Sequence, residues 1–203
     1  RFCAFWYGRP LNFNETVSLP VIEEYYRYKT YSGKLPEVSF INTGNFKFIL
    51  YYFLYKFKDR PLDSMVCVRK LSKPFFSVKN SDKLLFVFQD VENIPYANEK
   101  SVKLMNDNLN HFADMLAKKG IKLYFMPIVD KYNLYSDYIV NNPYPKSVFF
   151  ELLRPLPKKY GFIDTKAILI EEIKKGERDV YYADDTHWSW KASKSIFEKV
   201  KFE

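Results

Sequence analysis

Cysteine and histidine are scarce in this chain of 203 residues, which has two of each. Cys3 and Cys67 form no Cys-x-x-Cys pair and lie away from both histidines, His111 and His187. This spacing argues against a structural zinc site and against a disulfide-rich scaffold, although one disulfide is compatible with it. Because the two histidines are far apart and no ligand pattern surrounds them, we expect no metal and no cofactor.

A long apolar run is also absent. The longest candidate, Phe46 to Phe57, is interrupted by Lys47 and Lys56, so we expect no transmembrane helix. The chain starts at Arg1, which is not a natural first residue, and we expect either a removed leader or a start inside a longer protein. A removed leader would fit an exported protein, in the periplasm or at the cell surface, and that is the location we expect.

Motifs of nucleic-acid-binding modules are missing too, although the formal net charge is +8. A positive charge favours encounter with anionic partners such as nucleic acid, acidic polysaccharide or a membrane surface. The basic residues are scattered, however, in pairs such as Lys118-Lys119 and Lys174-Lys175. Since these pairs match no known nucleic-acid module, we expect no nucleic-acid partner.

What the chain does contain is enough apolar material for a core. It is 47% hydrophobic and 19% aromatic. A length of 203 residues suits one well-buried domain, so we expect a single domain over residues 1–203, which would lack its first strand or another terminal part if the chain is a piece of a longer protein. Most of the aromatic side chains are expected in the interior.

Helices and strands alternate along the second half of the chain. Residues 99–119 carry apolar side chains at spacings of three and four and end at Gly120, which predicts a helix. The apolar run 121–128 predicts a strand, and this order is typical of a parallel sheet with crossover helices. The same pattern predicts a strand at 162–163, a helix at 166–175, a strand at 179–183 and a helix from about Ser189.

The first half adds a strand at 37–42, a tight turn at Thr43-Gly44-Asn45 and a helix over 46–57. Residues 75–78 and 84–88 are apolar and flank a polar segment, which predicts a β-hairpin inserted into the α/β pattern. Together these elements predict a three-layer α/β/α fold with a mainly parallel sheet and an inserted β-hairpin.

The segment Asp184-Asp185-Thr186-His187-Trp188 places a histidine beside two carboxylates, between a predicted strand and the last predicted helix. Loops at this position of an open parallel sheet face the ligand. A histidine that acts as general base needs a carboxylate that fixes its tautomer and stabilises its protonated form. The segment therefore predicts two thirds of a hydrolytic triad. A structural alternative is that Asp184 and Asp185 cap the last helix while Trp188 packs beneath it.

Asp185-Thr186-His187-Trp188, followed by Ser189, resembles the Asp-x-His-Trp signature of the alginate O-acetyltransferase-like branch of the SGNH hydrolase superfamily. Softer similarities extend the resemblance over residues 77–202. It implies an SGNH-like fold, related to that of flavodoxin, and a serine that attacks an acyl ester while histidine takes its proton. In this branch Asp185 would orient His187, whereas in general SGNH hydrolases the carboxylate three positions before the histidine, Asp184, would do so.

The nucleophile is the point at which the chain departs from the family. No Gly-Asp-Ser occurs in it, and the two orders known in the family place the serine either upstream of this region or well beyond His187. In the first order, Gly44 would donate its backbone amide to the oxyanion, with Asn45 beside it. Alternatively, Thr43-Gly44-Asn45-Phe46 stands where Gly-Asp-Ser-Phe would be, and Asn45 replaces the serine. Ser39 and Ser77 are further candidates, each in a predicted strand.

Lys131, Tyr132 and Tyr135 come just after a predicted strand and, with Trp188, would line a groove for a sugar or its acyl group. The alternative is an ordinary amphipathic loop. His111 lies in the middle of a predicted helix and is expected to be structural. We expect an esterase or O-acyltransferase, most readily for acetyl groups, that acts on an acylated glycan or another small ester. The alternative is an inactive carbohydrate-binding or structural module of the same fold.

Overall fold

The computed structural model describes residues 5–6, 9–10 and 50–200. Where the sequence predicts one domain, the structure divides the chain into two compact units, Arg1–Val68 and Arg69–Glu203. The described residues form a mixed α/β structure of helices and small sheets. Each sheet within the described ranges has two strands, so the broad parallel sheet expected from the sequence is not seen there.

The first unit has three short described elements, which are β1 (Phe5–Trp6), β2 (Arg9–Pro10) and the 3-10 helix η1 (Pro61–Asp63). The two strands pair antiparallel. Residues 50–54 are helical, inside the helix predicted over 46–57. The Tyr55 hydroxyl follows this helix and donates a hydrogen bond of 2.8 Å to the carbonyl of Val66. The strand predicted at 37–42 lies outside the described residues.

The second unit holds most of the described elements. The strand β3 (Val66–Lys70) leads into it from the first unit. The further elements are, in order, β4 (Lys83–Val87), α4 (Gln89–Glu92), η2 (Ile94–Tyr96), α5 (Glu99–Ala117), β5 (Tyr124–Phe125), α6 (Lys131–Tyr135), η3 (Ser136–Tyr138), α7 (Phe149–Leu153), β6 (Gly161–Phe162), α8 (Thr165–Lys174) and α9 (Trp190–Lys199).

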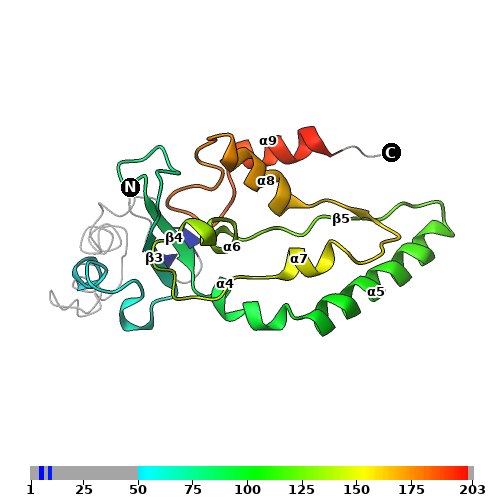
Figure 1. Cartoon of the computed structure of the whole chain (residues 1–203), viewed down its shortest axis with the longest axis horizontal. Coiled ribbons are helices and arrows are strands. Elements are labelled where there is room, and N and C mark those ends of the chain that lie inside the picture. The colour runs from blue at the N-terminus through cyan, green and yellow to red at the C-terminus, as the bar shows by residue number, and fades with distance from the viewer. Residues whose placement is uncertain (1–4, 7–8, 11–49, 201–203) are drawn as a thin grey trace, which may run out of the picture. The chain divides into compact units, whose positions relative to one another are not determined.

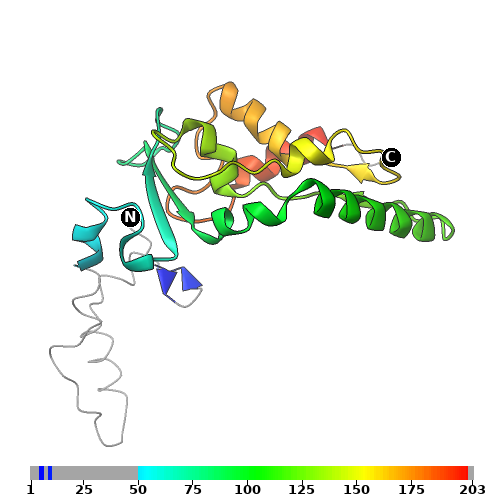
Figure 2. The same cartoon turned by 60° about the horizontal axis from the view of Figure 1, so that its bottom comes forward.

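Helix α5 confirms the strongest periodic pattern in the sequence, and it runs along one edge of the second unit (Figure 2). Asn98 begins the helix because its side chain accepts a hydrogen bond of 3.1 Å from the backbone N–H of Ser101, and the Ser101 hydroxyl contacts the backbone N–H of Asn98 in return. Gly120 follows the helix with a φ of 71°, a left-handed conformation that glycine adopts without strain.

The two C-terminal helices are confirmed as well, each with a local stop or start signal. The carboxylate of Asp164 accepts a hydrogen bond of 2.9 Å from the N–H of Ala167 at the start of α8, and Gly176, with a φ of 91°, follows the end of that helix. The Ser189 hydroxyl accepts a hydrogen bond of 3.1 Å from the N–H of Lys191 at the start of α9. Ser189, and not Asp184 or Asp185, therefore caps the last helix.

Strands β5 and β6 of the second unit form a parallel pair. Tyr124 of β5 is opposite Gly161 of β6. Helices α8 and α9 lie on one side of this pair and α5 lies on the other (Figures 1 and 2). The strand predicted over 121–128 is thus real but only two residues long.

The predicted hairpin is wrong in one of its strands. Strand β4 pairs with β3, and residues 75–78 form no strand. The Leu71 amide donates to the carbonyl of Asp82 where the chain turns from β3 to β4. Phe75 and Phe76 are buried instead, with ring centroids 5.3 Å and 5.6 Å from that of Tyr135. An apolar run that resembles a strand therefore supplies an aromatic core.

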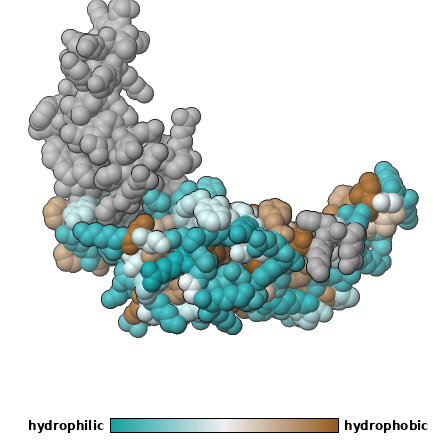
Figure 3. All heavy atoms as spheres, turned by 90° about the horizontal axis from the view of Figure 1, so that it is seen from above, coloured by the Kyte–Doolittle hydropathy of each residue, from teal (hydrophilic) through white to brown (hydrophobic). Residues whose placement is uncertain are grey.

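The surface of the described residues agrees with the absence of a long apolar run. None of the helices in the described ranges has the length and apolar character needed to cross a membrane. The face in Figure 3 is mostly hydrophilic, with hydrophobic residues scattered over it. Several large apolar side chains are exposed on α5, among them Leu104 and Phe112.

Replacement of Gly161 by alanine is expected to destabilise the β5–β6 pair. The added Cβ would lie 2.3 Å from Cδ1 of Tyr124. Overpacking of this kind lowers the free energy of unfolding by about 1–3 kcal/mol. Equilibrium denaturation of Gly161→Ala, alone and with Tyr124→Ala, measures the effect. The cost should shrink in the double variant because the clashing ring is gone, and an equal cost in both backgrounds would contradict this packing.

Candidate functional site

The candidate site lies on a short loop that returns on itself before α9. Tyr181 and Trp188 form an isolated antiparallel bridge. Around it, the Tyr182 amide donates to the carbonyl of His187 at 3.2 Å, and the Ser189 amide donates to the carbonyl of Val180 at 2.9 Å. The strand predicted over 179–183 is reduced to this bridge. We call residues 181–188 the catalytic loop because they carry the predicted acid and base.

Within the catalytic loop, His187 and Asp185 are in direct contact. The Nδ1 atom of the imidazole lies 2.7 Å from Oδ1 of Asp185. The same oxygen accepts hydrogen bonds from the backbone amides of Thr186 at 2.5 Å and of His187 at 3.3 Å. The His187 side chain is 74% exposed and that of Asp185 is 25% exposed. The loop thus presents the ring to solvent and keeps its carboxylate partner partly covered.

Hydrogen bonds keep the Asp185 carboxyl ionised. Burial is the largest single effect and raises the pKa of Asp185, but the hydrogen bonds from the imidazole of His187 and from the Thr186 amide, together with the charge and the amide of His187, outweigh it. The net result is a pKa below the ordinary value for an aspartate. An ionised carboxylate on Nδ1 favours the tautomer with the proton on that nitrogen, which leaves Nε2 able to accept a proton.

The sequence left Asp184 and Asp185 as possible partners of His187, and in the structure Asp185 makes the contact. This is the arrangement that the Asp-x-His-Trp resemblance implies. Asp184 precedes it on the same loop and acts on the nearby Lys131 through its charge. Trp188 is half-buried and belongs to the bridge that closes the loop.

Lys131 lies beneath the catalytic loop, and the expectation that it lines an open groove is wrong. Its side chain is 1% exposed. The ammonium donates to the backbone carbonyls of three loop residues, at 2.7 Å to Tyr182, 3.1 Å to Ala183 and 2.9 Å to Asp185. It also lies 5.1 Å from the centroid of the Phe76 ring. Sequence reasoning found the residue but missed its partners, because nothing local in the sequence connects residue 131 with residue 182.

The tyrosines expected beside Lys131 are also in the interior. Tyr132 and Tyr135 are fully buried. The Tyr132 hydroxyl donates to the carbonyl of Pro145 at 2.8 Å, and Tyr135 packs its ring against Phe75 and Phe76. These side chains therefore pack helix α6 into the interior instead of lining the predicted groove.

Ser77 is the candidate nucleophile that lies among the described residues, and it forms no hydrogen bond with the imidazole. Ser77 is exposed, lies in a bend and not in the predicted strand, and donates its amide to Oδ1 of Asp179 at 2.8 Å. Within the described residues, no serine hydroxyl forms a hydrogen bond with His187. Ser39, Gly44 and Asn45 lie outside the described residues.

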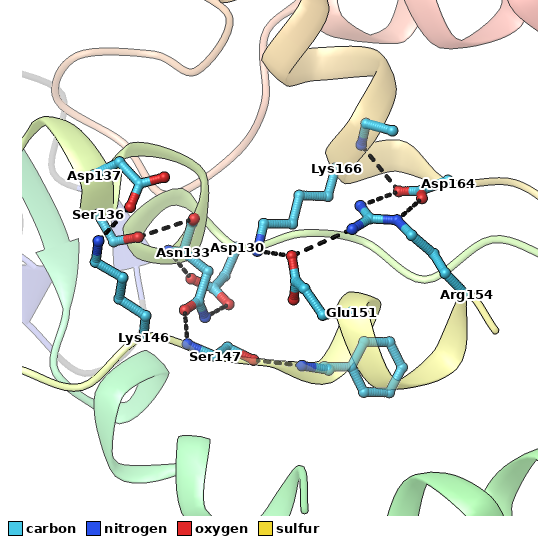
Figure 4. A network of polar contacts seen from close by, with 12 residues as sticks. Asp130, Asn133, Ser136, Asp137, Lys146, Ser147, Glu151, Arg154, Asp164 and Lys166 are labelled. Atoms are coloured by element: carbon cyan, nitrogen blue, oxygen red, sulfur yellow. Dashed lines mark hydrogen bonds and ion pairs between the residues drawn. The ribbon is translucent and has the colours of Figure 1, made fainter. Parts of the chain in front are cut away.

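A second polar cluster surrounds a cavity of about 270 Å³. Asp130 and Asp90 line it, together with Asn93, Asn133 and Lys166. Burial and the negative charge of Asp130 raise the pKa of Asp90 to about 7. The Asn133 side chain donates to Asp130 at 2.5 Å and accepts from the Ser147 amide at 3.1 Å, as Figure 4 shows.

The cluster was only partly visible in the sequence. Asp90 follows one strand and Asp130 follows another, forty residues later, so that only the fold brings them to one cavity. No group of three or more His, Cys, Asp or Glu residues within the described ranges could hold a metal ion. His111 is exposed on α5, away from both clusters in the sequence.

Comparisons of the chain with protein-family models, with curated proteins and with solved structures find no match.

Replacement of Asp185 should release the imidazole, whereas replacement of Asp184 should not. Asp185→Ala removes the acceptor for Nδ1, so the ring is expected to lose its fixed tautomer. Nitrogen-15 NMR of the imidazole rings reports the tautomer directly, and the second histidine, His111, serves as an internal reference. If Asp184→Ala changed the His187 signals more than Asp185→Ala, the assignment of the acid would be wrong.

The buried ammonium gives the protein a specific pH dependence. Burial lowers the pKa of Lys131 to about 7, and the charges of Asp185 and Asp184 oppose that shift. In the unfolded chain a lysine has a pKa of about 10.4, so between about pH 7 and about pH 10.4 the unfolded state binds more protons than the folded one. The contribution of Lys131 to the free energy of unfolding therefore rises with pH across this window, and is least favourable below it.

Lys131→Met is expected to flatten this rise. Denaturant titrations of the wild type and the variant at several pH values between 7 and 10 measure it. Lys146→Met is the matched control, since it removes an exposed ammonium that pairs with Asp137. Equal pH dependence in the wild type and in Lys131→Met would contradict the assignment of the buried cation.

Proposed function

We propose that this protein is an SGNH-like esterase or O-acyltransferase in which His187 is the general base and Asp185 is the carboxylate that orients it. The observation that carries the proposal is the contact of 2.7 Å between Nδ1 of His187 and Oδ1 of Asp185, on an exposed loop. The Asp-x-His-Trp resemblance supports the same assignment. A histidine held in this way is suited to take a proton from a hydroxyl group.

In the proposed reaction a serine hydroxyl attacks the acyl carbon of an ester while Nε2 of His187 takes the serine proton. The alkoxide of the sugar or other alcohol then leaves and receives that proton, which yields an acyl-enzyme. Water or a second alcohol attacks the acyl-enzyme in the same manner, and His187 returns its proton to the serine. Asp185 stays ionised throughout and stabilises the charged imidazolium. Ser39 and Ser77 are the candidates for this serine within the sequence.

The proposal includes the finer architecture expected from the sequence, a three-layer α/β/α fold with a mainly parallel sheet. The parallel pairing of β5 with β6 supports it, as does the placement of α8 and α9 on one side of that pair and α5 on the other. A parallel pair needs a crossover connection, and the stretch between β5 and β6 contains helices α6 and α7.

The polar lining of the second cluster supports a carbohydrate as the substrate. The cavity of about 270 Å³ is lined by the carboxyl group of Asp90 and the amide group of Asn93, and by Asp130 and Asn133, which are hydrogen-bonded to each other. Such groups donate to and accept from sugar hydroxyls. Phe149 and Phe150 supply an apolar wall in the same cavity. We therefore propose an acylated glycan as the substrate class, with acetyl as the transferred group.

A second candidate function is an inactive glycan-binding module of the same fold. The observation that favours it is that the Ser77 hydroxyl forms no hydrogen bond with His187, while the backbone amide of Ser77 donates to Asp179. The two candidates make different demands on the protein. An enzyme needs a reactive serine, whereas a module needs only the binding surface.

A fluorophosphonate probe distinguishes the two. Applied to the full-length product of the gene, it should label one serine, and His187→Ala should reduce the labelling by at least about a hundredfold, since general base catalysis contributes that much. His111→Ala is the matched control and should label as the wild type does. Glycan binding without any labelling of the folded wild-type protein would favour the module and sink the enzymatic proposal.

A further inference from the structure

Helix α6 holds the backbone of Lys131, from which the side chain reaches the catalytic loop. Lys131 is the first residue of α6. The carboxylate of Asp130 caps this helix by accepting a hydrogen bond of 2.8 Å from the Asn133 amide, and Tyr132 and Tyr135 anchor the helix in the core. The lysine backbone is therefore fixed, and its side chain has a defined direction.

The number of N–H donors on the Lys131 ammonium equals the number of carbonyl acceptors that the loop places around it. A protonated lysine carries three N–H groups and no acceptor. The loop offers three backbone carbonyls, those of Tyr182, Ala183 and Asp185, all between 2.7 and 3.1 Å from the nitrogen. A buried ammonium without such partners would be strongly unfavourable, so the fold requires the loop to wrap around it.

One residue joins this buried contact to the exposed one. Asp185 accepts the Lys131 ammonium through its backbone carbonyl, at 2.9 Å, and His187 through its side chain, at 2.7 Å. The position of the Asp185 backbone therefore decides where its carboxylate meets the imidazole. The positive charge of Lys131 also acts on the carboxylates of Asp185 and Asp184, the two acidic groups of the loop that face it, and the Phe76 ring lies against it from another segment.

We infer that Lys131 is a positioning residue, an internal cation that holds the catalytic loop in the conformation in which Asp185 orients His187. The inference rests on the proposed function only in calling His187 a general base, because the coupling of the ammonium to the histidine is a property of the folded loop. Lys131 itself touches no reacting atom.

Lys131→Met tests the inference, because methionine retains an unbranched side chain and removes the ammonium. Tyr182 is exposed and Ala183 and Asp185 are half-buried, so water can reach the loop and replace the lost donor, and the protein should remain folded. At a pH below 7, where Lys131 is protonated, hydrogen exchange at the amides of Tyr182 and Ser189, which close the loop, should accelerate about tenfold or more, since one hydrogen bond to a charged donor is worth that factor. The amides of α5 should exchange as in the wild type.

The imidazole of His187 gives a signal that would not change if Lys131 only stabilised the fold. In Lys131→Met the His187 nitrogens should lose the signature of a single fixed tautomer, while those of His111 stay unchanged. Lys146→Met, the control on an exposed ion pair, should leave both rings and the loop amides as they are. A folded Lys131→Met with wild-type exchange at the loop and a wild-type His187 spectrum would overturn the inference.

A measurement on the wild type keeps the test decisive should Lys131→Met fail to fold. At a pH below 7 the Lys131 ammonium protons should be protected from exchange and show couplings across hydrogen bonds to the carbonyl carbons of Tyr182, Ala183 and Asp185. An ammonium in rapid exchange, without these couplings, would refute the inference. Fluorophosphonate labelling is independent of both results, so loss of the esterase proposal and loss of this one would be told apart.

Discussion

A buried ammonium group must be surrounded by acceptors, and this requirement at Lys131 organises the C-terminal part of the protein. Removal of a charge from water is strongly unfavourable unless hydrogen bonds replace the lost solvation. Lys131 is followed on α6 by Tyr132, Asn133, Leu134 and Tyr135, and the acceptors of its ammonium come from a segment about fifty residues later in the sequence, the catalytic loop. The path of that loop follows from the position of one cation.

The catalytic loop has an inner and an outer side with different chemistry. Its backbone carbonyls point inward to the ammonium, whereas the imidazole of His187 is exposed. Asp185 belongs to both sides, with its carbonyl on Lys131 and its carboxylate on His187. The buried contact with Lys131 holds the backbone of Asp185, and the Asp185 carboxylate in turn holds the exposed imidazole of His187 in one orientation. A general base requires such a defined orientation. The Lys131 ammonium fixes the loop by binding its carbonyl oxygens, as a bound metal ion does in other proteins, and needs no set of metal ligands.

Sequence reasoning succeeded where the cause is local. Helix α5 follows from its apolar spacing and from Asn98 and Gly120 at its ends, and the contact between Asp185 and His187 follows from a separation of two residues on a tight loop. It failed where the cause is tertiary. Residues 75–78 have the composition of a strand, but Phe75 and Phe76 pack on Tyr135 instead.

The buried lysine shows the same limit more sharply. A lysine just after a strand predicts an exposed, groove-lining cation, because lysine is almost never fully buried unless it has partners. Those partners are backbone carbonyls, which every residue possesses and which therefore leave no trace in the side-chain pattern. The pair of Asp90 and Asp130 is hidden for a related reason, since the cavity that joins them exists only in the folded chain.

The most direct test of the account is the nitrogen-15 spectrum of the His187 imidazole in the wild-type protein, recorded at a pH where the ring is neutral. One tautomer is expected, with the proton on Nδ1 shared with Asp185 and Nε2 unprotonated. A ring with its proton on Nε2, or one that averages between both tautomers, would contradict it.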